Sequence, residues 1–414
     1  MNRTPQAVNV KLNDTLVGEL IFETKGDKQG SAFRYDNAWL RDGFALDPHL
    51  PLTAGWHHHW SRPGDTRSAL PSAIADCAPD AWGRKLMTAQ LGRAPTELEA
   101  LLSVNDTTRL GALRFVDKGN RALGHEPTAT PAEGELSDIQ RLCQLVETGA
   151  LSDAANAARA LCGRGDSLGG ARPKSDCVDA TGTLHLAKFM TSRDTVPVTR
   201  LEVATLQLAK DVGLRAADAR LVGPHDPFPI ALVKRFDRQG QLRIPYISAK
   251  SFIGEGTFYS EIAEQLIETS TGSFLSEANE LYERVAFTIL VKNTDDHLRN
   301  HGLLRVGNEW VLSPVFDVNP QPTRHPQLKT GIHPSVGFVP SVEALVELAD
   351  AFIIDRTSAA KRVAKMARTL QTQWRVRCAQ YGMTPKEIAS FAPAFEHREL
   401  NTAIGFERVA SQRR

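Results

Sequence analysis

The first forty positions alternate apolar and polar residues, which is the pattern of short β-strands. The segments VNVKL, VGELIFE and AFRYDNAWL carry this alternation on either side of a GDKQG turn. They predict a small β sheet. Residues 79–87 then open a helical region that residues 97–102 continue, and residues 110–116, LGALRFV, predict one more strand.

The middle of the chain mixes helical and strand-like patterns. Residues 117–136 are polar and contain Pro and Gly, which favours a linker. Helices are predicted at residues 139–147 and 153–161, and a further helix opens at residue 197 and stops at Gly213. The predicted strands of this region are residues 177–179, 184–189, 218–222 and 229–236.

From residue 260 onward the chain becomes helical. The predicted helices are residues 260–269, 276–292, 342–348, 357–377 and 385–389. A β-rich half followed by a helical half predicts an α+β, bilobal protein-kinase-like fold rather than a doubly wound sheet. The predicted domains are an N-terminal subdomain of sheet and helices (residues 1–120), a region like a kinase N-lobe (135–240) and a helical C-lobe (241–414).

The composition of the chain argues against several classes of protein, among them those that bind nucleic acid or membranes through bulk charge. The chain has 414 residues, and 49 basic against 48 acidic side chains give a net charge of +1, so there is no bulk attraction to nucleic acid or anionic membrane. Five cysteines without a CxxC pair favour neither a disulfide framework nor a zinc site. No stretch has the length of a signal peptide core or a membrane span, so we expect a soluble cytoplasmic protein that does not act at a membrane.

Three adjacent histidines, His57 to His59, stand between Trp56 and Trp60. Neighbouring residues cannot easily all face one ion, and no Cys or carboxylate lies at ligand spacing. We therefore expect a solvent-exposed loop rather than a metal site.

One acidic segment offers the chemistry of phosphoryl transfer. The run NTDDHLRN (residues 293–300) places Asp295 and Asn300 five positions apart, as in the catalytic loop of protein kinases. Two apolar runs around Gly307-Asn308 predict a hairpin that returns Asp317 to Asn300. These side chains can supply one base and two metal ligands. Asp and Asn also cluster in turns and caps, but here the flanking segments are apolar, where unpaired charge is costly.

A glycine-rich loop lies upstream of this segment. Residues 163–174, GRGDSLGGARPK, include Gly169, Gly170 and Ala171, whose backbone can approach a phosphate closely. Lys188 lies at the end of the strand pair that follows this loop. Kinases place at this position the lysine that binds the α and β phosphates of ATP. The alternatives are a loop that is only flexible and a lysine that is only an exposed strand residue.

Further candidate site residues lie downstream of Lys188 in the sequence. Glu202 can orient Lys188, or it can form a capping box with Thr199 for purely local reasons. Lys234 and Phe236 belong to PIALVKRFDR, which is expected where a kinase has its hinge, so both are candidate nucleotide contacts. His297 is another candidate, although a role in supporting the loop is favoured.

Together these motifs resemble the HipA family of bacterial serine/threonine kinases, the toxins of toxin–antitoxin pairs. The resemblance rests on SLGGARPK, LHLAKF, VKRFDR, NTDDHLRN and PVFD, with FRYDNAWL, PDAWGR and GALRF nearer the start. It implies ATP and Mg²⁺, with Asp295 as the catalytic base, Asn300 and Asp317 as metal ligands and Lys188 on the phosphates.

The resemblance also implies how such a protein is used. It implies inhibitory autophosphorylation at Ser167, a small helix-turn-helix antitoxin as partner, and contact with DNA only through that partner. The implied target is a cellular protein such as an aminoacyl-tRNA synthetase.

One segment departs from the family pattern and leaves the substrate open. RIPYISAK (residues 243–250) stands where many relatives carry an acidic, glutamine-containing stretch. Two other functions therefore remain: a transferase that acts on a small molecule, and a non-catalytic interaction module.

Overall fold

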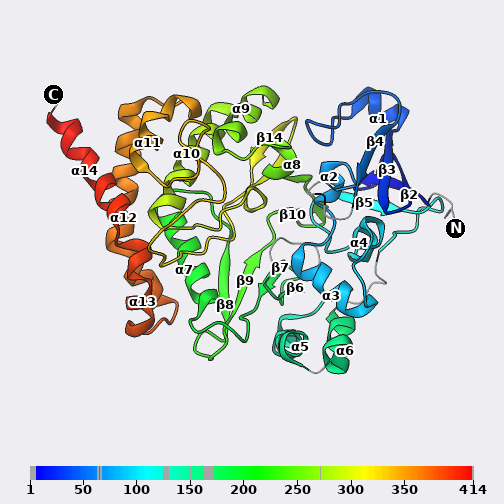
Figure 1. Ribbon diagram of the computed structural model, residues 1–414, viewed down its shortest axis with the longest axis horizontal. Coiled ribbons are helices and arrows are strands. Elements are labelled where there is room, and N and C mark those ends of the chain that lie inside the picture. The colour runs from blue at the N-terminus through cyan, green and yellow to red at the C-terminus, as the bar shows by residue number, and fades with distance from the viewer. Residues whose placement is uncertain are drawn as a thin grey trace. The chain divides into compact units, whose positions relative to one another are not determined.

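The structure is a computed structural model. It describes residues 6–62, 65, 68–124, 130–149, 151–161, 172–270 and 272–412. The chain forms two compact units (Figure 1). The first consists of Met1–Ser192 and Asp237–Ile247, and the second of Arg193–Phe236 and Ser248–Arg414.

An antiparallel five-stranded sheet begins the first unit, where the alternating pattern predicts a small β sheet. The strand order is β4-β3-β2-β1-β5. Val8 lies opposite Leu20, and Leu20 lies opposite Phe33, so a fully buried apolar row crosses three strands. The strands are β1 (Gln6–Leu12), β2 (Thr15–Lys25), β3 (Lys28–Tyr35), β4 (His57–Ser61) and β5 (Leu113–Val116).

The three histidines lie in a strand, so the predicted loop is wrong. They belong to β4, which pairs with β3 at the edge of the sheet, with Ser31 opposite His59. Their partner strand lies about thirty positions upstream, so the pairing is invisible in the local sequence. In the part of the chain that the structure describes, no group of three or more His, Cys, Asp or Glu side chains is arranged to hold a metal.

A buried arginine joins the helical segments of the first unit. Arg109 donates to the carbonyl oxygens of Cys77, Leu101 and Val104, and its guanidinium lies 4.8 Å from the Phe115 ring centroid. Burial lowers the pKa of Arg109 to about 10. The helices are α1 (Asn37–Asp42), α2 (Ser72–Ala75), α3 (Ala81–Leu91), α4 (Glu97–Ser103), η1 (Glu133–Glu135), α5 (Leu136–Thr148) and α6 (Leu151–Leu161).

Two short hairpins complete the first unit. β6 (Lys174–Val178) and β7 (Leu184–Lys188) pair antiparallel, as predicted, and turn at Gly182, whose φ of 78° suits glycine. β10 (Arg238–Gln239) and β11 (Leu242–Arg243) belong to the second part of the unit. This part is anchored because the Asp237 carboxylate accepts a 2.7 Å hydrogen bond from the Gly111 amide.

The second unit opens with α7 (Val198–Asp211) and the hairpin of β8 (Ala219–Val222) and β9 (Ile230–Lys234). Thr199 does not cap α7, so the predicted capping box with Glu202 is wrong. The helix already begins at Val198, and the Thr199 hydroxyl donates instead to the Pro229 carbonyl at 2.8 Å. The tertiary contact with a segment 30 residues away replaces the local one.

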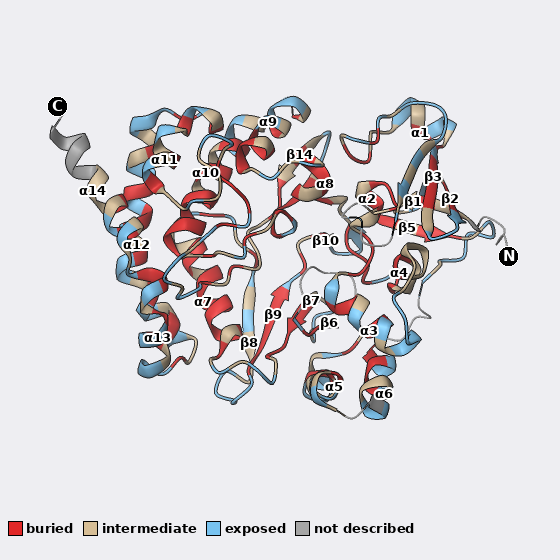
Figure 2. Cartoon of the chain, in the orientation of Figure 1, coloured by how far each residue is buried: buried red, intermediate tan, exposed pale blue. Residues whose placement is uncertain are grey.

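The rest of the second unit is mainly helical, and Figure 2 colours much of α10 as buried. Trp374 stacks on Phe395 with ring centroids 4.7 Å apart, which joins α12 to α13. Four helical elements of this part lack a counterpart in the sequence prediction: α8, η2, η3 and α14. The elements are β12 (Tyr246–Ser248), which leads from one unit into the other, α8 (Ala249–Ile253), α9 (Tyr259–Thr269), α10 (Phe274–Leu290), η2 (Leu298–Asn300), β13 (Gly302–Val306), β14 (Glu309–Leu312), α11 (Val342–Glu347), η3 (Ala349–Phe352), α12 (Arg356–Gln380), α13 (Pro385–Phe395) and α14 (Arg398–Gln412).

The predicted fold class is confirmed: the protein is α+β, with strands concentrated toward its N-terminus and helices toward its C-terminus. Over the described residues, the structure contains no helix with the length and apolar character that a membrane span requires.

Candidate active site

The predicted catalytic loop starts where α10 ends. Lys292 follows this helix with a positive φ of 48°, and the Asn293 amide donates back to the Thr288 carbonyl at 2.9 Å. The loop then closes with the 3-10 turn η2, which contains Asn300. A long buried helix therefore fixes the start of the loop, and a tight turn fixes its end.

Asp296 is buried and anchors the loop. Its Oδ2 accepts hydrogen bonds from the Tyr259 hydroxyl (2.6 Å), the Thr288 hydroxyl (3.0 Å) and His301 Nε2 (2.9 Å). Burial raises the pKa of Asp296, but the His301 ring and the two hydroxyls outweigh burial, and the net pKa lies below the usual range. Asp296 is therefore a structural acid that joins three elements.

Asp295, the predicted base, has the opposite environment. It is exposed, and its carboxylate makes no hydrogen bond or ion pair with any residue that the structure describes. It lines a hollow of about 460 Å³ between residues 294–295 and the segment 321–329, which we call the Asp295 hollow. Of the two adjacent acids, the exposed one is available to an incoming molecule.

Hydrogen bonds tie Asp317 and Asn300 into the same loop system. The Asn300 side-chain Nδ2 donates to the Asp295 carbonyl at 3.3 Å. Asn319 donates from its backbone to Asn293 Oδ1 (3.1 Å) and from its side chain to Asp317 Oδ1 (3.0 Å). The hairpin β13–β14 between these segments forms around Gly307, as predicted. The structure thus joins both ends of the predicted site through Asn319.

The backbone at Asp317 is strained. Its φ is 56°, in the left-handed region that a non-glycine residue adopts at a cost of about 1–3 kcal/mol. Such strain persists only where the surroundings enforce it.

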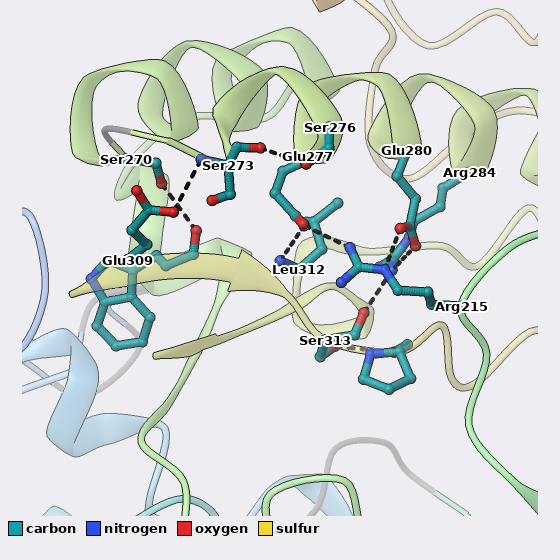
Figure 3. A network of polar contacts seen from close by, with 12 residues as sticks. Arg215, Ser270, Ser273, Ser276, Glu277, Glu280, Arg284, Glu309, Leu312 and Ser313 are labelled. Carbon is teal, nitrogen blue, oxygen red and sulfur yellow. Dashed lines mark hydrogen bonds and ion pairs between the residues drawn. The ribbon is translucent and has the colours of Figure 1, made fainter. Parts of the chain in front are cut away.

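A network of ion pairs fixes the strand that leads to Asp317 (Figure 3). Glu277 on α10 accepts from the Leu312 amide and from Arg215, each at 2.7 Å. Arg284, also on α10 and buried, donates to Glu280 and to the Ser313 carbonyl, the latter at 2.7 Å. The network therefore holds the end of β14 against α10, four to five residues before Asp317.

An aromatic pair lies beside this segment. Phe236, a predicted nucleotide contact, packs against Phe316 with ring centroids 5.3 Å apart. Lys234, the other contact predicted in that stretch, is exposed at the end of β9. The hydrophobic residue before Asp317 thus meets the segment that was predicted to act as the hinge.

His297 packs into the loop as a structural residue would. Its amide donates to the Asp295 carbonyl (2.9 Å), and its carbonyl accepts from the Asn300 amide (2.8 Å). Its Nδ1 and the Asn293 Nδ2 are buried, and neither atom has a hydrogen-bond partner in the described part of the chain. The loop therefore retains two buried polar atoms without a partner among the described residues, which is uncommon in folded proteins.

Lys188, the predicted phosphate-binding lysine, belongs to the first unit. Lys188 is buried at the end of β7, directly opposite Lys174. Lys174 is neutralised by Asp80 at 2.8 Å, the residue that caps α3. Glu202 is buried on α7 of the second unit, and its pairing with Lys188 stays a prediction. The predicted loop residues Ser167, Gly169, Gly170 and Ala171 lie outside the described residues.

The site residues that remain as candidates suit Mg²⁺ chemically. Magnesium prefers oxygen ligands and is usually held by one or two carboxylates together with substrate phosphates. The bond from Asn300 Nδ2 to the Asp295 carbonyl leaves Oδ1 as the acceptor of that amide. Asn300 and Asp317 thus form a donor set of the right kind.

Sequence reasoning missed the residues that hold the site together. Asp296 stands beside Asp295 in the same motif, but only its distant partners reveal its role. Asn319 has no feature in the sequence that marks its role. For Arg284 there was a signal, because an arginine among the apolar residues of α10 indicates a buried ion pair.

The fold and the site together define a class of protein. It is an α+β protein in which an exposed acid, an amide and a second acid belong to one hydrogen-bonded loop system. Residues 8–116 match the HipA N-terminal domain, and residues 166–374 match the HipA-like C-terminal domain. Because the second match alone spans half of the chain, the chain belongs to the HipA family.

The fold resembles that of a solved structure. The HipA chain of the Shewanella oneidensis MR-1 toxin–antitoxin system, solved with HipB and its operator DNA, is similar over 98% of this chain and 99% of that chain, with a TM-score of 0.69 and 18% identity. At this identity the similarity shows the fold. The Helicobacter pylori proinflammatory kinase CtkA covers 58% of this chain and 95% of its own, with a TM-score of 0.44 and 13% identity, too low to support an argument. No curated protein matches the chain.

Proposed function

We propose that this protein is an ATP-dependent serine/threonine protein kinase of the HipA toxin type. The observation that carries the proposal is the contrast within the Asp295-Asp296 pair. The Asp296 carboxylate accepts three buried hydrogen bonds. Asp295 is instead exposed and lines a hollow, and Asn319 links its loop to Asp317 by hydrogen bonds. A free acid beside two potential metal ligands is what phosphoryl transfer requires.

Each residue has a defined role in this proposal. Lys188 and the glycine-rich loop bind the ATP phosphates, and Asn300 and Asp317 would hold Mg²⁺, which when bound neutralises charge on the phosphates. The hydroxyl oxygen of the acceptor attacks the γ-phosphorus, the bond to the β-phosphate oxygen breaks, and ADP leaves. Asp295 takes the proton of the hydroxyl.

Labelled ATP tests this function. The purified protein is incubated with Mg²⁺ and ATP labelled on the γ-phosphate, in one arm with cell lysate and in the other with a metabolite pool. We expect the label on serine or threonine of a lysate protein. Label on a metabolite alone would instead make the protein a small-molecule kinase, and no transfer in either arm would contradict both.

The proposal includes regulation at Ser167. A phosphate added there carries about −1.5 to −2 charges at neutral pH and is repelled by the neighbouring Asp166, which favours displacement of the loop. We expect phosphopeptide mapping after incubation with ATP to find phosphate on Ser167, and the Ser167→Ala variant to stay active for longer. An active enzyme with an unmodified loop would reject this regulation.

We also propose a small helix-turn-helix protein as partner, with DNA bound through that partner. The support is the family together with the similar HipA structure, which was solved with HipB and operator DNA.

A further inference from the structure

The Asp295 hollow has the size and the chemistry of a binding site for an acceptor. Its volume of about 460 Å³ lies within the range of roughly 300–1,000 Å³ that is usual for ligand clefts. Asp295 lies on one wall, and the opposite wall is the segment 321–329. A molecule in the hollow therefore lies against the proposed base.

Hydrogen bonds fix the wall 321–329 to the catalytic loop. The Gln321 amide donates to the Lys292 carbonyl at 3.0 Å, and Lys292 Nζ donates to the Thr323 carbonyl at 3.3 Å. At the far end of the wall, the Thr330 hydroxyl donates to the Asp296 carbonyl at 2.7 Å. Both ends of the wall thus contact the loop that carries Asp295, so the hollow is preorganised.

The lining is polar, which suits a polypeptide. Leu328 is the apolar residue among those that line the hollow, and it is buried, whereas Gln321 and Gln327 are exposed and offer amide donors and acceptors. Amide side chains can pair with the backbone of an extended peptide. A lipid chain would find little apolar surface here.

Lys329 gives the hollow a positive charge beside the acid. Lys329 and His325 line it and are exposed, and neither makes a hydrogen bond or ion pair with any residue among those described. Unlike Lys174, which Asp80 neutralises, Lys329 has its ammonium group available. A carboxylate of the bound molecule is the natural counter-charge, and His325 adds a ring nitrogen for a hydrogen bond.

We propose that the Asp295 hollow binds the acceptor segment of a protein substrate whose serine or threonine has an acidic residue close by in sequence, and that Lys329 reads this acid. The inference rests on the proposed kinase function and adds to it a substrate class. The hydroxyl reaches Asp295 while the neighbouring carboxylate pairs with Lys329.

Synthetic peptides test the inference. Each peptide has one serine in a neutral background, and its flanking positions carry Glu, Gln or Lys in turn. With wild-type enzyme and Mg-ATP we expect kcat/KM to be about five- to tenfold higher for the best Glu peptide than for its Gln counterpart, since a partly exposed ion pair is worth about 1 kcal/mol. The Lys329→Gln variant should lose this preference, and the Lys329→Glu variant should prefer the Lys peptide.

The reversal of preference separates recognition from structural damage, because a misfolded variant loses rate on all peptides alike. The matched control is Lys361→Glu, an exposed lysine on α12, which should keep the wild-type preference. If the Lys329→Glu variant keeps the preference for Glu peptides, or the wild type prefers Lys peptides, the inference is wrong.

The outcome also separates this inference from the proposed function. A wild-type enzyme that labels lysate proteins but shows no acid preference among peptides overturns only the role of Lys329. An enzyme that labels neither lysate proteins nor peptides overturns the kinase function, and the inference falls with it.

Discussion

Replacing Asp295 by Asn should lower the rate of phosphoryl transfer by about 10²–10⁴-fold, the usual contribution of a general acid or base. The substitution keeps the volume of the side chain but removes the atom that takes the proton. Because the Asp295 carboxylate is exposed and bonded to no described residue, the free energy of unfolding should change by less than about 0.5 kcal/mol.

Initial rates at saturating ATP and a urea unfolding curve measure the two effects on the same preparation. Asp350→Asn, at an exposed acid of η3, is the matched control and should leave both unchanged. Should Asp295→Asn retain more than half of the wild-type rate, Asp295 is not the base.

Replacing the adjacent Asp296 by Ala should mainly affect stability rather than the chemical step. We expect the free energy of unfolding to fall by about 3–5 kcal/mol, as is typical when one member of a buried charged pair is removed. The Tyr259 and Thr288 hydroxyls and the His301 ring would lose a shared acceptor inside the protein. Urea unfolding measures the loss, and Asp295→Asn is the control one residue away. A stable Asp296→Ala protein would mean that the loop is held by other contacts.

The loss should also depend on pH. The folded pKa of Asp296 lies below that of an unfolded aspartate, about 3.9, so its contribution is complete above about pH 4 and is lost as the pH falls through the folded value. The difference in unfolding free energy between wild type and Asp296→Ala should therefore be constant near neutral pH and shrink below about pH 4. A difference that grows on acidification would contradict the assigned direction of the pKa.

The features that the sequence predicts well are local ones. The hairpin around Gly307 and the alternation of β1 to β3 follow from neighbouring residues, and the structure has both. The motif of residues 293–300 is also found from spacing alone, because its residue types and intervals lie within one loop, and the catalytic roles of its residues stay predictions.

The features that the sequence does not reveal depend on distant partners. Asp295 and Asp296 are adjacent and chemically identical, and partners such as Tyr259, from 37 positions away, show which of them is buried. His57 to His59 look like a loop until β3 pairs with them. Thr199 looks like a cap until Pro229 accepts its hydroxyl. In each case a tertiary hydrogen bond replaces the local interaction that the pattern favours.

Calorimetric titration of Mg-ATP is the most direct test of the central proposal, that Asp317, Asn300 and Lys188 all take part in binding Mg-ATP. The wild type should bind Mg-ATP, and the Asp317→Asn and Lys188→Ala variants should bind it at least about tenfold more weakly. The Lys188 variant loses a hydrogen bond to a charged group, worth about 1.5–3 kcal/mol, and the Asp317 variant loses a carboxylate ligand of Mg²⁺. Absence of binding by the folded wild type, or equal affinities of the wild type and both variants, would contradict the claim.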